Sequence, residues 1–119
     1  MTKIRNPKQY DLEERTYGFA KEVIQYVNLL PKTISNIETS KQLVRASGSV
    51  GANYIEANEA LGKKDFIMRI KISRKEAKES RYWLRLTELK EENLQTREDL
   101  IQEATELTKI FGSILEKCK

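Results

Sequence analysis

The amino-acid sequence predicts an all-α protein, folded as an antiparallel up-and-down four-helix bundle. Apolar residues recur at steps of three and four along four long segments, which is the spacing of amphipathic helices. Only two prolines and five glycines occur in 119 residues, so little interrupts these segments. The expected connections between them are short, as in bundles whose consecutive helices run in opposite directions.

The first predicted helix follows a loose N-terminal arm, residues 1–10. Asp11 and Glu14 form a capping-box pattern, in which side chains satisfy backbone N–H groups at a helix start. Apolar residues then continue at helical spacing as far as Pro31, which cannot extend a helix. The bundle domain is therefore expected to span residues 11–119.

The second predicted helix has two candidate N-caps, Ser35 and Thr39, and is expected to end at about Gly62. Its middle contains Gly48 and Gly51. Each mid-helix glycine costs roughly 0.5–1 kcal/mol relative to alanine. Close approach of a neighbouring helix is the simplest explanation for both.

The third predicted helix runs from about Lys64 to about Lys90, and the fourth begins at Thr96, with Asp99 completing its cap. The third has a seam spaced nearly as in a coiled coil: Phe66, Ile70, Ser73, Ala77, Ser80 and Leu84. The fourth has a comparable stripe: Leu100, Ala104, Leu107, Phe111, Ile114, Leu115 and Cys118.

The composition argues against catalysis. The chain has no histidine, which removes the commonest general base and the commonest metal ligand. Its single cysteine, Cys118, cannot form an intrachain disulfide, and no glycine-rich phosphate loop occurs. We therefore expect no enzymatic activity, no catalytic residues, no cofactor and no metal. One alternative is a metal site at Glu56 and Glu59, although Glu56 is better explained as an ion-pair partner of the third helix.

No segment is long and apolar enough to span a membrane, and the N-terminus has no apolar run behind its charges. We therefore expect a cytoplasmic protein that makes no membrane contact. The absence of disulfides suits a reducing compartment.

Positive charge is concentrated in one predicted helix. Residues 63–90 contain ten Lys or Arg and four Asp or Glu, whereas the remainder of the chain has a slight acidic excess. Six cations fall on one arc of this helix beside its apolar seam: Lys71, Arg74, Lys75, Lys78, Arg81 and Arg85. Such a stripe suits phosphate backbones, and the neighbouring Tyr82 and Trp83 could stack on bases. The alternative is a solvated face with local pairs such as Lys75 with Glu79.

A second apolar arc lies on the same helix, turned away from the seam. Its members are Met68, Ile72, Trp83 and Leu86. A bundle needs one buried stripe per helix, so a second stripe predicts an interface with another subunit. Single exposed apolar residues are common, which is the alternative explanation.

Several stretches resemble one bacterial protein family. They are residues 10–16 (YDLEERT), 30–31 (LP), 42–45 (QLVR), 49–59 (SVGANYIEANE), 64–66 (KDF) and 73–80 (SRKEAKES). Together they resemble the four-helix-bundle proteins encoded in intervening sequences of 23S rRNA genes, and the likeness extends from Tyr10 to about Leu115. Ala46 departs from the pattern, where a serine is expected after the arginine.

The resemblance implies an up-and-down bundle that assembles as a homo-oligomer, typically a pentamer, with no established enzymatic activity. A related bundle serves diversity-generating retroelements, where it looks like a partner of nucleic acid and reverse transcriptase. Our leading hypothesis is therefore a homo-oligomeric, RNA-associated accessory protein that uses the basic stripe. The alternative is a protein-interaction scaffold that does not bind nucleic acid.

Overall fold

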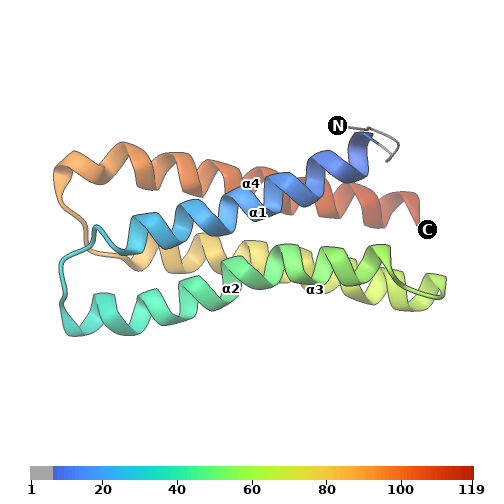
Figure 1. The fold of residues 1–119 in the computed structure, drawn as a ribbon, viewed down its shortest axis with the longest axis horizontal. Helices are drawn as coiled ribbons and strands as arrows, with labels where there is room; N and C mark the ends of the chain where they lie inside the picture. The colour runs from blue at the N-terminus through green and yellow to red at the C-terminus, as the bar shows by residue number, and fades with distance from the viewer. Residues whose placement is uncertain (1–6) are drawn as a thin grey trace.

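The computed structural model describes residues 7–119, with side chains from residue 12 onward, and shows four long α-helices (Figure 1). In chain order the elements are α1 (Pro7–Val27), α2 (Ile34–Asn58), α3 (Lys63–Leu86), a short 3₁₀ helix η1 (Glu91–Asn93) and α4 (Leu94–Lys117). No β-strand occurs among these residues. The predicted all-α class is confirmed.

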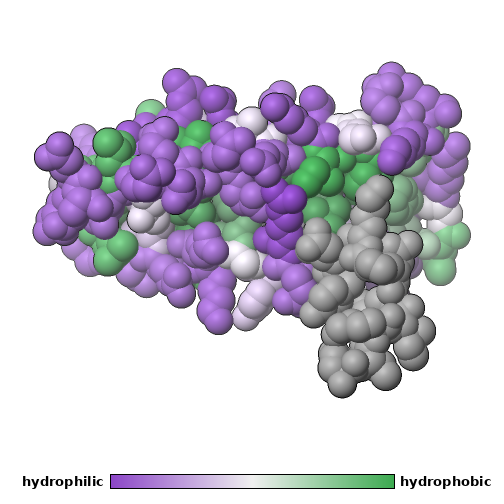
Figure 2. Space-filling view, turned by 90° about the horizontal axis from the view of Figure 1, so that it is seen from above, coloured by the Kyte–Doolittle hydropathy of each residue, from purple (hydrophilic) through white to green (hydrophobic). Residues whose placement is uncertain are grey.

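Consecutive helices run in opposite directions, so α1 and α3 point one way and α2 and α4 the other (Figure 1). The most extensive packing is that of α3 on α2 and on α4, and α1 closes the bundle against α2 and α4. The backbone measures 44 × 32 × 18 Å, which is a flattened bundle. The upper face, formed by α1 and α4, is mostly hydrophilic, with more hydrophobic surface toward the end where α4 finishes (Figure 2).

The core contains the predicted seam of α3. Phe66 is partly buried, and the other five seam residues are inaccessible to solvent. Two of them are serines whose hydroxyls are satisfied: Ser73 Oγ donates to the Val50 carbonyl of α2 at 2.9 Å, and Ser80 Oγ donates to the Glu76 carbonyl at 2.8 Å. Small side chains with internal hydrogen bonds allow α3 to approach its neighbours closely without unpaired polar groups.

The start of α1 differs from the prediction. The helix begins at Pro7, four residues before Asp11, so Asp11 lies within the helix and does not cap it. Proline suits the first helical position, because the N–H group it lacks would have no partner there. Residues 1–6 of the predicted arm lie outside the described residues. At its other end α1 stops at Val27, before Pro31.

The cap of α2 is neither of the two predicted residues. Thr33 is the N-cap, and its Oγ1 accepts a hydrogen bond from the Asn36 N–H at 3.1 Å. Ser35 and Thr39 both lie inside the helix. The predicted end is also wrong, because α2 stops at Asn58 and Gly62 instead precedes α3 as its N-cap.

The end of α3 and the start of α4 also differ from the prediction. The third helix ends at Leu86 rather than near Lys90, and Thr87 Oγ1 donates to the Leu84 carbonyl at 2.7 Å. The fourth begins at Leu94 after η1, so Thr96 lies within its first turn and is not its cap.

One buried asparagine joins the two loops at the same end of the bundle. Asn36 is 2% exposed, and its Nδ2 donates to the carbonyls of Pro31 at 2.9 Å and Glu88 at 2.7 Å. Its Oδ1 accepts from the Glu88 N–H at 2.8 Å. A single side chain thus satisfies three backbone groups in the α1–α2 and α3–η1 connections, and it fixes their spacing.

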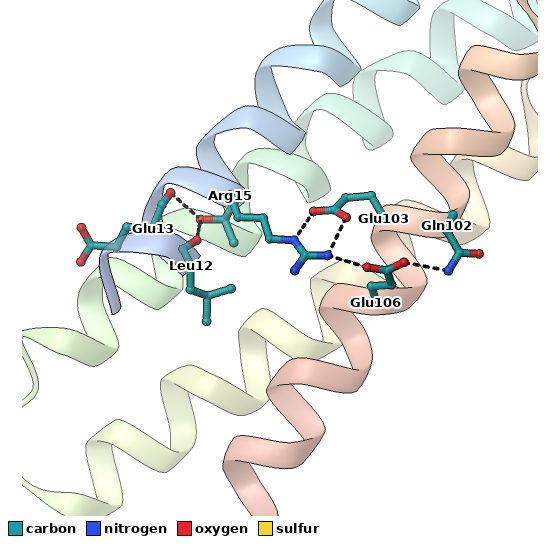
Figure 3. Close-up of polar contacts among 7 residues, drawn as sticks. Leu12, Glu13, Arg15, Gln102, Glu103 and Glu106 are labelled. Atoms are coloured by element: carbon teal, nitrogen blue, oxygen red, sulfur yellow. Dashed lines mark hydrogen bonds and ion pairs between the residues drawn. The ribbon is translucent and has the colours of Figure 1, made fainter. Parts of the chain in front are cut away.

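An ion cluster holds α1 on α4 (Figure 3). Arg15 Nε donates to Glu103 Oε2 at 2.7 Å, and Arg15 Nη2 donates to Glu103 Oε1 at 2.9 Å and to Glu106 Oε1 at 2.6 Å. The hydrogen bond to Glu103 raises the pKa of Arg15 above its ordinary value. Hydrogen bonds from Gln102 and Arg15 lower the pKa of Glu106 below its ordinary value. Both shifts favour the charged pair.

The two glycines of α2 have different surroundings. A Cβ atom at Gly51 would lie 2.9 Å from Thr16 Oγ1 and 3.1 Å from Thr16 Cβ, so α1 passes close to this position. Thr16 is buried and its hydroxyl donates to the carbonyls of Leu12 and Glu13, which limits its movement. A Cβ at Gly48 would meet nothing within 4 Å. Close approach therefore explains Gly51 and not Gly48.

This difference predicts opposite effects of the same substitution. Gly48→Ala should stabilise the protein by about 0.5–1 kcal/mol, because alanine favours the helix. Gly51→Ala should destabilise it by about 1 kcal/mol, because the cost of overpacking against Thr16 exceeds that gain. Urea unfolding followed by circular dichroism measures both. Stabilisation by both substitutions would contradict the packing described here.

The ion cluster of Arg15, Glu103 and Glu106 should make a pH-dependent contribution to the free energy of unfolding. A carboxylate whose pKa is lowered in the folded state contributes stability above its unfolded pKa, and that contribution disappears as the pH falls through the folded pKa. Arg15→Met should therefore destabilise the protein at pH 7 and do so progressively less below about pH 4, where the carboxylate of Glu106 becomes protonated. Lys41→Met, which removes an exposed pair with Glu38, is the control. A difference between wild type and Arg15→Met that stays constant from pH 7 to pH 3 would refute this role.

Candidate nucleic-acid interface

The six predicted cations all lie exposed on α3, along its border with α4. The structure divides them between two hollows. A groove of about 530 Å³, which we call the lysine groove, is lined by Lys71, Arg74, Lys75, Lys78, Glu79 and Leu115. A smaller hollow of about 250 Å³, the arginine pocket, is lined by Arg81, Arg85, Arg97, Glu98 and Ile101. In the lysine groove α3 supplies all the charged residues and α4 supplies the apolar Leu115. In the arginine pocket α3 supplies two arginines, and α4 supplies Arg97, Glu98 and the apolar Ile101.

None of the six cations forms an ion pair within residues 12–119. The local pair considered in the sequence, Lys75 with Glu79, is not formed. Glu79 instead accepts from Arg45 of α2 at 3.4 Å, and the buried Glu76 accepts from the same guanidinium at 3.3 Å. Glu76 and Glu79 of α3 therefore pair with α2, and the six cations form no ion pair, although Glu79 also lines the lysine groove.

Arg74 is positioned by a glycine of the fourth helix. A Cβ atom at Gly112 would lie 3.3 Å from Arg74 Nε and 3.9 Å from its Cδ, so the arginine side chain lies across the backbone of α4 at this point. The missing side chain gives the guanidinium stem a place to rest.

The two aromatic residues next to the stripe differ in exposure. Tyr82 is 56% exposed, whereas Trp83 is half-buried and packs against the core. Their rings meet edge to face with centroids 5.0 Å apart. Trp83 Nε1 is buried and has no hydrogen-bond partner among the described residues. Tyr82 is thus the more exposed of the two aromatic residues beside the cations.

The second apolar arc is only partly at the surface. Met68 and Leu86 are 46% and 49% exposed, and Ile72 and Trp83 are half-buried. Met68 also lines an open hollow of about 700 Å³ with Gly62, Lys64, Asp65, Ile67 and Lys71. The arc and the basic stripe therefore adjoin near the start of α3.

The remaining candidates of the sequence do not assemble into a site. Glu56 and Glu59 are exposed. The expected ion pair between Glu56 and α3 is not formed among the described residues. Cys118 is a half-buried free thiol. In the described part of the chain, no three His, Cys, Asp or Glu side chains come together as a metal site. No helix there is long and apolar enough to cross a membrane.

Comparison with known proteins supports the resemblance seen in the sequence. The family model described as 23S rRNA-intervening sequence protein matches residues 8–113. The chain belongs to this family. A similar solved structure is the crystal structure of a protein with unknown function from the S23 ribosomal protein family of Bacteroides thetaiotaomicron VPI-5482. The two sequences are 28% identical. The superposed region covers 92% of this chain and 98% of the Bacteroides chain, with a TM-score of 0.74. No curated protein matches the chain.

In this 23S rRNA-intervening sequence protein, α4 contributes site residues that the sequence did not reveal. Arg97 completes the arginine pocket and Gly112 underlies Arg74. A stripe on one helix can be found from residue spacing, because all its members share one axis. Which residues of a second helix lie beside that stripe depends on how the two helices pack, and residue spacing does not give this. A mid-helix glycine on α4 was the one signal that could have indicated Gly112.

The lack of ion pairs predicts that the stripe contributes little to stability. The triple variant Lys71→Gln, Lys75→Gln, Lys78→Gln should unfold within about 0.5 kcal/mol of the wild type, or should be more stable because repulsion is relieved. Arg45→Gln should cost about 1–2 kcal/mol, because it removes the partner of the buried Glu76. Urea unfolding compares the two. A large loss of stability in the triple variant would show that the cations serve the fold.

Proposed function

We propose that this 23S rRNA-intervening sequence protein is a non-catalytic, homo-oligomeric accessory protein that binds RNA or another nucleic acid through the cationic border of α3 and α4. The observation that carries the proposal is the unpaired state of all six stripe cations. Clustered like charges repel one another, and a polyanion relieves that repulsion. Glu76 and Glu79, the acidic residues nearest to them on α3, instead pair with Arg45 of α2.

The length and the residue types of the stripe favour contacts with the phosphate backbone of a nucleic acid. From Lys71 to Arg85 the stripe covers fourteen residues of helix, or about 21 Å. Three of the four groove cations are lysines, whose flexible point charges suit phosphates without reading base sequence. Tyr82 is more than half exposed beside the stripe, where its ring could stack on one base.

The apolar arc supports self-association as part of the same proposal. Met68, Ile72, Trp83 and Leu86 form a second apolar face on a helix whose seam is already buried. Burial of this face against another copy, in a pentamer by resemblance to the family, would repeat the cationic border around an assembly. Repetition converts a weak salt-sensitive contact into a strong one.

The arc also favours a second candidate function, that of a protein-interaction scaffold. Met68 and Leu86 are exposed apolar side chains of this face, on which a partner protein could dock. In this case nucleic acid would leave the protein's hydrodynamic size unchanged, and the arc would account for all binding.

Charge reversal in the lysine groove tests the leading proposal. The triple variant Lys71→Glu, Lys75→Glu, Lys78→Glu should weaken binding of a labelled single-stranded RNA at least about tenfold in low salt, measured by fluorescence anisotropy. The slope of log affinity against log salt should become shallower by about 2, because each lost phosphate contact removes about 0.7 on a single strand.

A matched variant separates location from net charge. Lys21→Glu, Lys32→Glu, Lys41→Glu makes the same charge change on α1, the α1–α2 loop and α2, where these lysines are exposed. It should retain most of the binding. Equal losses in the two triples would mean that net charge alone attracts RNA. No binding by a folded wild-type oligomer in low salt would refute the proposal.

A further inference from the structure

The arginine pocket differs chemically from the rest of the cationic border. Its basic residues are all arginines, two from α3 and one from α4, and they surround a hollow of about 250 Å³, less than half the volume of the lysine groove. Guanidinium groups are planar and donate paired hydrogen bonds that match the oxygens of a phosphate. A small hollow lined in this way suits one compact anion rather than a stretch of backbone.

The donors of these arginines are largely unused. Arg81 and Arg85 form no hydrogen bond or ion pair with the described residues. Arg97 Nη1 donates to the Thr87 carbonyl at 3.0 Å, which anchors its guanidinium at the end of α3. Its Nε is buried without a hydrogen-bond partner, and the nearest carboxylate, Glu98, lies 3.9 Å away. The guanidinium groups of Arg81 and Arg85 are exposed and unpaired, so their donors are available to an anion in the pocket, while Arg97 supplies a fixed positive charge beside them.

The charge of the pocket indicates which anion fits. Three arginines and one glutamate give the lining a net charge of +2. A phosphodiester carries a single negative charge, whereas a phosphate monoester carries nearly two at pH 7. We propose that the arginine pocket binds a terminal phosphate monoester, at the end of a nucleic-acid strand or on a free nucleotide. The strand-end form rests on the proposed function, because the lysine groove would hold the remainder of the strand.

Oligonucleotides that differ only at their ends test this inference. Three versions of one labelled oligoribonucleotide are compared by fluorescence anisotropy: a 5′-phosphate, a 3′-phosphate and hydroxyls at both ends. At least one phosphorylated version should bind several-fold more tightly than the hydroxyl version, and the comparison shows which end is recognised. Equal affinities of all three would overturn the pocket while leaving groove binding intact.

Variants assign the preference to the pocket. Arg81→Gln with Arg85→Gln alters two exposed residues of the pocket. It should make the phosphorylated and hydroxyl oligonucleotides bind equally, in addition to any loss of affinity that all three share. Arg97→Met should do the same, and circular dichroism checks that loss of its bond to Thr87 leaves the fold intact. Lys75→Gln, in the lysine groove, should weaken all three oligonucleotides by the same factor and keep the preference. A preference that survives the double variant would refute the assignment.

A nucleotide alone separates this inference from the proposed function. Calorimetric titration with a nucleoside 5′-monophosphate, against the corresponding nucleoside, reports on the pocket without the groove. Binding of the monophosphate that the double variant loses would support the pocket even if no oligonucleotide binds. Absence of monophosphate binding, together with no end preference, would overturn it.

Discussion

The packing of α3 against both α2 and α4 is the constraint on which the rest of the structure depends. These two contacts are the most extensive in the bundle, and they pass through a seam with three small residues, Ser73, Ala77 and Ser80. Small side chains bring the helices close, and the serine hydroxyls are satisfied by carbonyls of α2 and of α3 itself. Because this narrow seam suffices for burial, a wide arc of α3 is left to face solvent.

That exposed arc is divided by charge. Toward α2, acidic residues of α3 share the guanidinium of Arg45, and Arg69 donates to Asn53 Oδ1 at 3.0 Å. Toward α4, the cations have no such partners. A sequence selected only for stability would place opposite charges across both borders, since like charges at helical spacing are destabilising. The asymmetry coincides with the two hollows, and it is the feature on which the proposed binding of an anionic ligand rests.

Residue spacing predicted the helices and the stripe, because both depend on positions along a single axis. The α3 seam from Ile70 to Leu84 and the α4 stripe up to Phe111 are buried as expected, and Phe66 is partly buried. The caps were wrong because several Ser, Thr and Asp residues offer the same local signal, and the loop geometry decides among them. Thr33 caps α2 only because the adjoining loop is held by Asn36, whose partner at Glu88 is 52 residues away. No local pattern could indicate that contact.

The arginine pocket also could not be predicted from residue spacing, and it makes the two ends of the cationic border chemically different. Spacing placed Arg81 and Arg85 in one stripe with the lysines, but only the approach of α4 adds Arg97 and separates them into a distinct hollow. The stripe then has unlike ends, with lysines near the start of α3 and arginines near its finish. A uniform stripe would accept a strand in either orientation. A pocket that takes a doubly charged terminus at one end favours a single orientation, because only one arrangement places the extra charge among the three guanidinium groups.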